Sequence, residues 1–124
     1  MFELFCAIAG FFLVSNHLQL FRSPSCYPNR GHIVLPPTTI APGSKETMVA
    51  RKASWCHTGS SGTVAWEIDG AEQSLVLLWS IPFNNTYYAN WLGAGITEPK
   101  HHFKADSSSF ESLYYNPIKA ENLK

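Results

Sequence analysis

The chain has 124 residues, hydrophobic residues make up 45% of it, and nine basic side chains balance nine acidic ones. This composition predicts one folded domain with a modest core and argues against intrinsic disorder. Because the net charge is zero and the basic residues form no run, the sequence gives no sign of a nucleic-acid-binding surface or of long-range attraction to anionic lipid.

An uninterrupted apolar stretch of eleven residues, Leu4–Val14, lies near the N-terminus. A helix that spans a bilayer needs roughly 20 residues, so this stretch is too short to cross a membrane. Two interpretations stay open with equal weight: a secretory signal peptide or anchor, and a buried first strand or helix. We therefore expect an apolar leader over residues 1–16 and a β-sandwich domain over residues 17–124.

Short strands and turns follow in the first half of the chain. The alternation of apolar and polar residues predicts a half-buried strand over His17–Arg22. Two prolines and a glycine predict a loop over Ser23–Gly31. We expect further strands over His32–Leu35 and Glu46–Lys52, with a turn at Ile40–Ser44 between them.

The middle of the chain carries the clearest strand signals. After a Ser/Gly-rich loop over Ser54–Gly62, the segments Thr63–Ile68 and Ser74–Ile81 are rich in β-branched and aromatic residues. Asp69-Gly70 begins their connection, so an antiparallel hairpin is predicted. The second strand is apolar on both faces, as expected of a central strand, and Pro82 ends it.

One helix is predicted near the C-terminus. Ser108 and Glu111 form a capping-box pattern, and Pro117 blocks extension, so the helix should run over Ser109–Tyr115. Together these elements predict an all-β protein, an antiparallel β-sandwich with a short α-helix packed on one side.

Aromatic residues are concentrated after the central strand and in the helix. We assign Trp66 and Trp79, on predicted strands, to the core. The segment after Pro82 and the helical face of Phe110 and Tyr114 could instead surround a choline group, because aromatic faces attract quaternary ammonium ions. Tyrosine and serine hydroxyls could bind the adjacent phosphate. The alternative is that the aromatic residues are core, which is the commoner role of such runs in small β domains.

The segment 79–96, WSIPFNNTYYANWLGAGI, resembles the signature of actinoporins and actinoporin-like proteins. Ser80, Pro82, Tyr88, Asn90 and Trp91 occupy its matching places. The segment 110–116, FESLYYN, resembles the family's Tyr-Tyr-Asn helix, with phenylalanine in place of the first tyrosine. The segments FRS, HIVLPP and TGSSGTVAWEI also resemble family segments in the right order, so the resemblance covers residues 18–116.

The resemblance implies a β-sandwich that binds phosphocholine lipids, especially sphingomyelin, and oligomerises on the membrane into a cation-conducting pore. It implies secretion and action at a target cell membrane, with storage in the nematocyst if the source is a cnidarian. The headgroup pocket implied by the matching positions comprises Ser23, Ser61, Ser80, Pro82, Tyr88, Phe110, Tyr114 and Tyr115. The side chains implied at the membrane interface are Phe83, Tyr87, Trp91 and Leu92.

Several positions depart from the family pattern. Phe110 lacks a hydroxyl group that would bind phosphate, and Ser61 stands where valine is common. Asn84 begins an Asn-Asn-Thr glycosylation sequon beside the implied membrane loop. The family's sandwich continues past the helix, and its lytic segment is an amphipathic N-terminal helix. We therefore expect a sandwich incomplete at its C-terminus and lipid binding more readily than pore formation.

The cysteines and the aromatic clusters allow further interpretations. Two interpretations of the cysteines remain open: Cys26 and Cys56 form a disulfide in an oxidising compartment, or all three cysteines stay unpaired.

The alternative function is a carbohydrate-binding, lectin-like sandwich, since Tyr and Trp clusters also stack on sugars. We expect no enzyme activity, cofactor or metal, because the histidines lie in unrelated segments without catalytic or zinc-ligand spacing.

Overall fold

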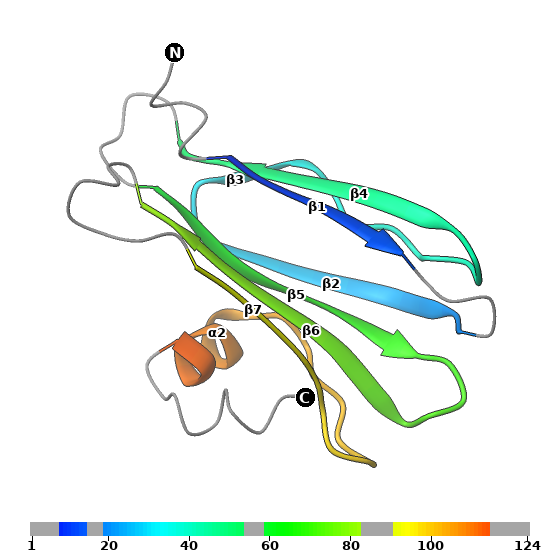
Figure 1. Cartoon of the computed structure of the whole chain (residues 1–124). Helices are drawn as coiled ribbons and strands as arrows, with labels where there is room; N and C mark the ends of the chain where they lie inside the picture. The colour runs from blue at the N-terminus through cyan, green and yellow to red at the C-terminus, as the bar shows by residue number, and fades with distance from the viewer. Residues whose placement is uncertain (1–7, 15–18, 54–58, 83–90, 115–124) are drawn as a thin grey trace.

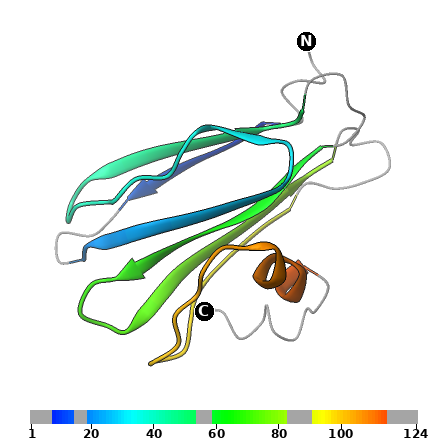
Figure 2. The same ribbon diagram turned by 180° about the vertical axis from the view of Figure 1, so that it is seen from behind.

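The computed structural model describes residues 8–14, 19–53, 59–82 and 91–114. Two antiparallel sheets face each other, and one short helix lies on the outer side of the larger sheet (Figures 1 and 2). The smaller sheet has the order β1-β4-β3, with β1 at Ile8–Val14, β3 at His32–Leu35 and β4 at Lys45–Arg51. The larger sheet has the order β2-β5-β6-β7, with β2 at Phe21–Arg30, β5 at Ser60–Ile68, β6 at Gln73–Ile81 and β7 at Trp91–Ile96. The helix, α2, spans Ser107–Tyr114.

The predicted fold class is confirmed, and so are the clearest strands. β3 and β4 coincide with two of the expected strands, and β5 and β6 pair as the expected antiparallel hairpin. Gly70 turns this hairpin with a φ of 79°, a left-handed conformation that glycine adopts without steric cost. β6 ends at Ile81, immediately before Pro82.

Strand β2 corrects the prediction of a loop over Ser23–Gly31. It pairs with β5 across most of this range in spite of Pro24 and Pro28. The prolines are tolerated because β2 is an edge strand and its pairing is interrupted by register shifts between Arg22 and Ser25 and between Pro28 and Arg30. Local composition therefore predicted a loop where tertiary pairing forms a bulged edge strand.

Strand β7 is a second correction. Trp91 and Leu92 were expected in an exposed loop, and they are instead the first residues of a strand that pairs with the end of β6. The alternating glycines in Trp-Leu-Gly-Ala-Gly-Ile weaken the local strand signal. Pairing with the strong central strand β6 supplies the missing stabilisation.

The helix begins earlier than predicted and has a different cap. Asp106 Oδ1 accepts a hydrogen bond from the Ser109 backbone N–H at 2.8 Å, and Ser109 Oγ accepts one from the Asp106 backbone N–H at 3.0 Å. This reciprocal pair is a capping box formed by Asp106 and Ser109, so the prediction that Ser108 and Glu111 form the box is wrong. Glu111 is exposed within the helix.

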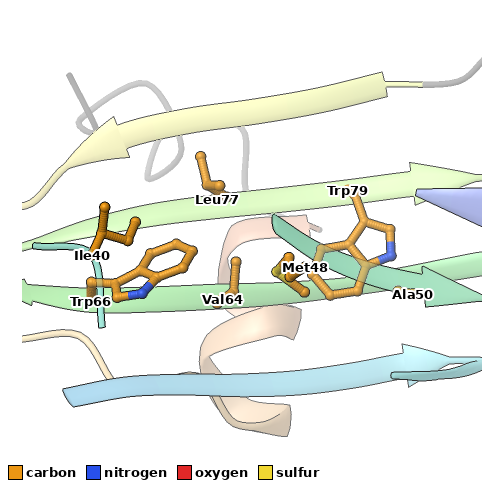
Figure 3. Packing of buried hydrophobic residues seen from close by; sticks show 7 residues of the cluster. All are labelled: Ile40, Met48, Ala50, Val64, Trp66, Leu77 and Trp79. Carbon is orange, nitrogen blue, oxygen red and sulfur yellow. The ribbon is translucent and has the colours of Figure 1, made fainter. Parts of the chain in front are cut away.

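The main core fills the space between the two sheets. It comprises Ile40, Met48, Ala50, Val64, Trp66, Leu77 and Trp79 (Figure 3). Trp66 and Trp79 are each only 1% exposed, which confirms their assignment to the core. The indole N–H groups are satisfied inside the sandwich, by Thr38 O at 2.8 Å for Trp66 and by Ser60 Oγ at 3.1 Å for Trp79.

Part of the expected leader lies in the smaller sheet. Ile8–Val14 form β1 and pair with β4 from Ile8↔Arg51 to Val14↔Lys45. This favours the strand interpretation for these seven residues, while cleavage or anchoring of the N-terminus stays a prediction. Among the residues that the structure describes, no helix has the length and apolar character needed to cross a membrane.

Candidate functional site

The outer face of the larger sheet is where the structure gathers four of the six described headgroup residues, Ser61, Ser80, Phe110 and Tyr114. The segment before α2 crosses this face and is bound to it by two serines. Phe103 N donates to Ser74 Oγ at 3.0 Å, and Ala105 N donates to Ser25 Oγ at 2.9 Å. These bonds hold the segment that leads from the start of β6 into α2, and α2 itself lies over the half of the sheet where β6 ends and β7 begins (Figures 1 and 2).

Three aromatic rings meet between α2 and the sheet. Phe110 and Tyr114 are one turn apart and stack, with centroids 5.3 Å apart and planes at 20°. Tyr27 of β2 also approaches Phe110, with a centroid separation of 6.1 Å and planes at 50°. Phe110 is 1% exposed, whereas Tyr27 and Tyr114 are half-buried. Phe110 therefore supports two tyrosines that reach the surface, and its own ring offers no face to solvent.

A row of polar side chains crosses the same face beyond these rings. Ser61 of β5 and Ser80 of β6 are direct cross-strand partners, which places their Cβ atoms about 5 Å apart. Asn29 of β2 donates from Nδ2 to Ser61 Oγ at 3.3 Å. Ser80 pairs in turn with Trp91 of β7. Ser61 is 7% exposed and Ser80 is half-buried, so solvent reaches these two hydroxyl groups only in part.

The spacing of the aromatic rings and the hydroxyl row follows from strand geometry. Tyr27 and Asn29 are two residues apart on β2, and both are on the α2 face, because one contacts Phe110 and the other bonds Ser61. Two residues of a strand span roughly 6.5 Å. Ring faces and hydroxyl groups at this separation suit a ligand that has a cation at one end and an anion at the other.

Ser23 is one described residue that the structure does not bring to this group. Its neighbour Arg22 pairs with Glu67, six residues along β5 from Ser61, a separation of about 20 Å. Ser23 is exposed in the bulge of β2, with a φ of 49°. The resemblance placed it in the pocket by sequence position, whereas the pairing of β2 places it at the other end of the strand.

The remaining expected residues divide into two groups. Pro82 is half-buried directly after β6, and Leu92 is 59% exposed on β7. Phe83, Asn84, Tyr87, Tyr88 and Tyr115 lie outside the described residues, as does Cys56. Their parts in headgroup binding, membrane contact, glycosylation or a disulfide therefore stay predictions.

Tyr27 and Asn29 are functional candidates that the sequence analysis missed. Both lie in the stretch predicted as a loop, so their side-chain directions were not considered. The signal that could have found them is the alternation along β2, in which Cys26 packs into the core while Tyr27 packs on the α2 face.

Cys26 is a core residue by its chemistry as well as its packing. It lies against the cluster between the sheets, and burial raises the pKa of its thiol to about 11. The reactive thiolate is therefore scarce at neutral pH.

Across the described part of the chain, no group of three or more His, Cys, Asp or Glu residues could hold a metal ion.

The fold and the site together define a class: an antiparallel β-sandwich with a tyrosine-and-serine surface beside one short outer helix, as expected of an actinoporin-like protein. Comparison with protein families agrees. Residues 25–124 match the family model described as sea anemone cytotoxic protein. The chain belongs to this family, which is one of cytotoxic proteins and not of enzymes.

Similar curated proteins come from molluscs and anemones. Tereporin-Ca1 of Terebra anilis is 41% identical over 102 residues, which cover 77% of this chain and 54% of tereporin-Ca1. Echotoxin-2 of Monoplex parthenopeus is 30% identical over 94 residues, 75% of this chain and 34% of the toxin. Cytolysin tenebrosin-B of Actinia tenebrosa is 36% identical over 67 residues, 52% and 30% of the two chains. The chain thus spans about half the length of tereporin-Ca1 and less of the other two.

Proposed function

We propose that this protein binds the phosphocholine headgroup of membrane lipids such as sphingomyelin on the α2 face of its larger sheet. In this proposal it is secreted and acts at a target cell membrane, where family members assemble into a cation-conducting pore. The observation that supports the proposal most directly is that Tyr27 shares the α2 face of β2 with Asn29, which bonds Ser61, while Tyr27 and Tyr114 both pack against Phe110.

The chemistry of the two parts matches the two ends of phosphocholine. The faces of Tyr27 and Tyr114 would attract the quaternary ammonium group, an interaction worth about 0.5–2 kcal/mol. The serine hydroxyls would donate hydrogen bonds to the phosphate oxygens. Neither part requires a net positive protein, in keeping with the chain's formal charge of zero. Headgroup chemistry, and not the net charge of the membrane, should therefore determine binding.

Side chains at the end of the sheet where β6 ends and β7 begins would contact the membrane interface. Leu92 is 59% exposed there, and its cross-strand partner is Trp79, so it lies on the opposite face of the sheet from Ser80. We include Phe83, Tyr87 and Trp91 in this contact because aromatic side chains favour the membrane–water boundary. Docking through this end would bring the headgroup site to the lipid surface.

The test is co-sedimentation of the protein with vesicles of phosphatidylcholine and sphingomyelin, and separately with vesicles of phosphatidylglycerol. We expect binding to the choline vesicles, competition by free phosphocholine, and roughly tenfold weaker binding for Tyr114→Ala. Tyr114→Phe keeps the ring and should retain most of the affinity. Val34→Ala, at a 53% exposed position on the smaller sheet, is the control.

Two results would contradict the proposal. One is equal binding to choline and phosphatidylglycerol vesicles without competition by phosphocholine. The other is unchanged binding of Tyr114→Ala when its far-UV circular dichroism matches that of the wild type. Dye release from the same vesicles would separately measure pore formation.

A further inference from the structure

A second hollow lies on the other flank of α2. It is a cavity of about 700 Å³, open to solvent, formed between the connection that follows β7 and the helix itself. Its volume is within the range of about 300–1,000 Å³ that small-ligand sites occupy. None of the described headgroup residues lines it.

The helix separates this cavity from the aromatic rings. Phe110 and Tyr114 are four residues apart and share one flank of α2. Ser108 and Ser112 are also four residues apart, and they line the cavity from the opposite flank. One short helix therefore presents two surfaces of different chemistry on the same side of the sheet.

The cavity has an apolar floor and a polar rim. Phe103 is half-buried and Leu113 is 6% exposed, and both line the cavity. Glu98, His101 and Lys104 are exposed around it. Glu98 and Asp106 line the cavity together with Lys104, so residues of both charge signs surround the same space.

The rim is anchored to the sheet by several hydrogen bonds. Thr97 Oγ1 donates to His101 O at 2.6 Å and accepts from Ser74 N at 2.8 Å. Gln73 Nε2 donates to Thr97 O at 2.7 Å. Because these bonds connect the segment to the start of β6, the positions of Glu98 and His101 are set before any ligand binds, which lowers the entropic cost of binding.

We propose that this cavity binds a neutral sugar residue of a glycan. A sugar hydroxyl donates and accepts at once, so it can donate to Glu98 and accept from Lys104. The half-buried Phe103 ring offers apolar surface for the C–H face of a pyranose ring. A phosphate group would be repelled by the two carboxylates, which outnumber the single ammonium group. Because hydrogen-bond donors, acceptors and apolar surface line the same cavity, we expect it to prefer an uncharged polyhydroxy ligand.

The test is binding of the full chain to immobilised neutral oligosaccharides that end in hexose or N-acetylhexosamine residues, without lipid. We expect binding to at least one of them, and about tenfold weaker binding for Glu98→Gln and for Lys104→Ala. Lys100→Ala and Glu111→Gln are matched controls, because both residues are exposed nearby and neither lines the cavity. Each control should bind like the wild type.

The same experiment separates this site from the headgroup site. Tyr114→Ala and free phosphocholine should leave glycan binding unchanged, so failure of lipid binding would not affect the result. Three outcomes would overturn the inference: no binding to any oligosaccharide, loss of glycan binding with Tyr114→Ala or with phosphocholine, and loss of phosphocholine binding with Glu98→Gln. The last would make the cavity a second headgroup site.

Discussion

The two faces of the larger sheet come from the same strands but differ in packing and in side-chain composition. On the inner face, Val64, Trp66 and Trp79 pack against the smaller sheet and exclude water. On the outer face, Ala65, Val76 and Leu78 form a smaller cluster under α2, which gives way to serines and half-buried tyrosines. Alternate residues of one strand therefore form the main core on one side and, on the other, the surface proposed to bind a ligand.

The largest effect should come from removing an inner-face indole. Trp79→Ala would leave a cavity and an unpaired Ser60 hydroxyl, so we expect a loss of about 3–5 kcal/mol in the free energy of unfolding. Denaturant titration measures this loss. The matched substitution Val34→Ala, at an exposed position, should change the value by less than about 0.5 kcal/mol. Similar losses for both variants would contradict the assigned core.

A smaller loss should follow from adding one carbon atom to the inner face. A Cβ on Gly62 would lie 2.4 Å from Tyr27 O and 2.6 Å from the Trp79 ring. Because one of these atoms is backbone, Gly62→Ala should cost about 1–3 kcal/mol in the free energy of unfolding. Gly70→Ala is the control with open space around it, where only the left-handed φ of 79° costs energy. A Gly62→Ala variant as stable as the wild type would show that the Trp79 ring is not seated over β5.

On the outer face we expect lost binding with little lost stability. Ser80→Ala should weaken binding to sphingomyelin vesicles about fivefold, as expected for one hydrogen bond. Ser23→Ala should have no effect, because Ser23 lies at the other end of β2. The two variants measured side by side in co-sedimentation decide between the structural placement of Ser23 and the one implied by the family resemblance. Weaker binding by Ser23→Ala would favour the resemblance.

The smallest effect concerns the cap of α2. Hydrogen bonding from the Ser109 backbone lowers the pKa of Asp106 below its ordinary value of 3.8. The charged carboxylate therefore stabilises the fold above the pKa of the unfolded chain, and this stabilisation disappears as the pH falls through the lowered pKa of the folded chain.

We expect Asp106→Ala to lower Tm slightly at pH 7, and the difference from wild type to shrink below about pH 4. Asp106→Asn keeps an oxygen that accepts the same bond and should lie closer to wild type at pH 7. Thermal melts from pH 3 to pH 7 measure both variants. A Tm difference for Asp106→Ala that does not change over this range would contradict the assigned cap.

The parts of the fold that sequence predicted are those with strong local signals. β5 and β6 are rich in β-branched and aromatic residues, and their turn contains Asp69-Gly70. β2 and β7 contain prolines or glycines, and they become strands only because a stronger neighbour pairs with them. Local propensity cannot report that pairing.

The cap of α2 shows a second limit on what local sequence can predict. Asp106, Ser107, Ser108 and Ser109 are consecutive, and each is a residue type that caps helices well. Local pattern cannot choose among them. The choice is made by a contact distant in sequence, because Ala105 N is bound to Ser25 Oγ on β2 and the chain enters the helix from there.

The residues of the candidate site also divide into those in segments with clear sequence signals and those whose positions depend on strand pairing. Ser80, Phe110 and Tyr114 lie in segments with distinct family motifs, and the structure places them on one face. Asn29 and Tyr27 were missed because their segment was predicted as a loop, and their side-chain directions follow only when that segment is treated as a strand. For the same reason the pairing of β2 moves Ser23 away from the other site residues.

The attachment of α2 through Ser25 and Ser74 has a consequence for variation in this protein. The segment that leads into the helix of Tyr114 is held to the sheet by two hydroxyl groups that lie 89 and 40 positions before Tyr114 in the chain. Alanine at either position is expected to leave the sandwich folded and to release this segment. Inherited changes at these serines would therefore weaken the proposed lipid binding without lowering the amount of folded protein.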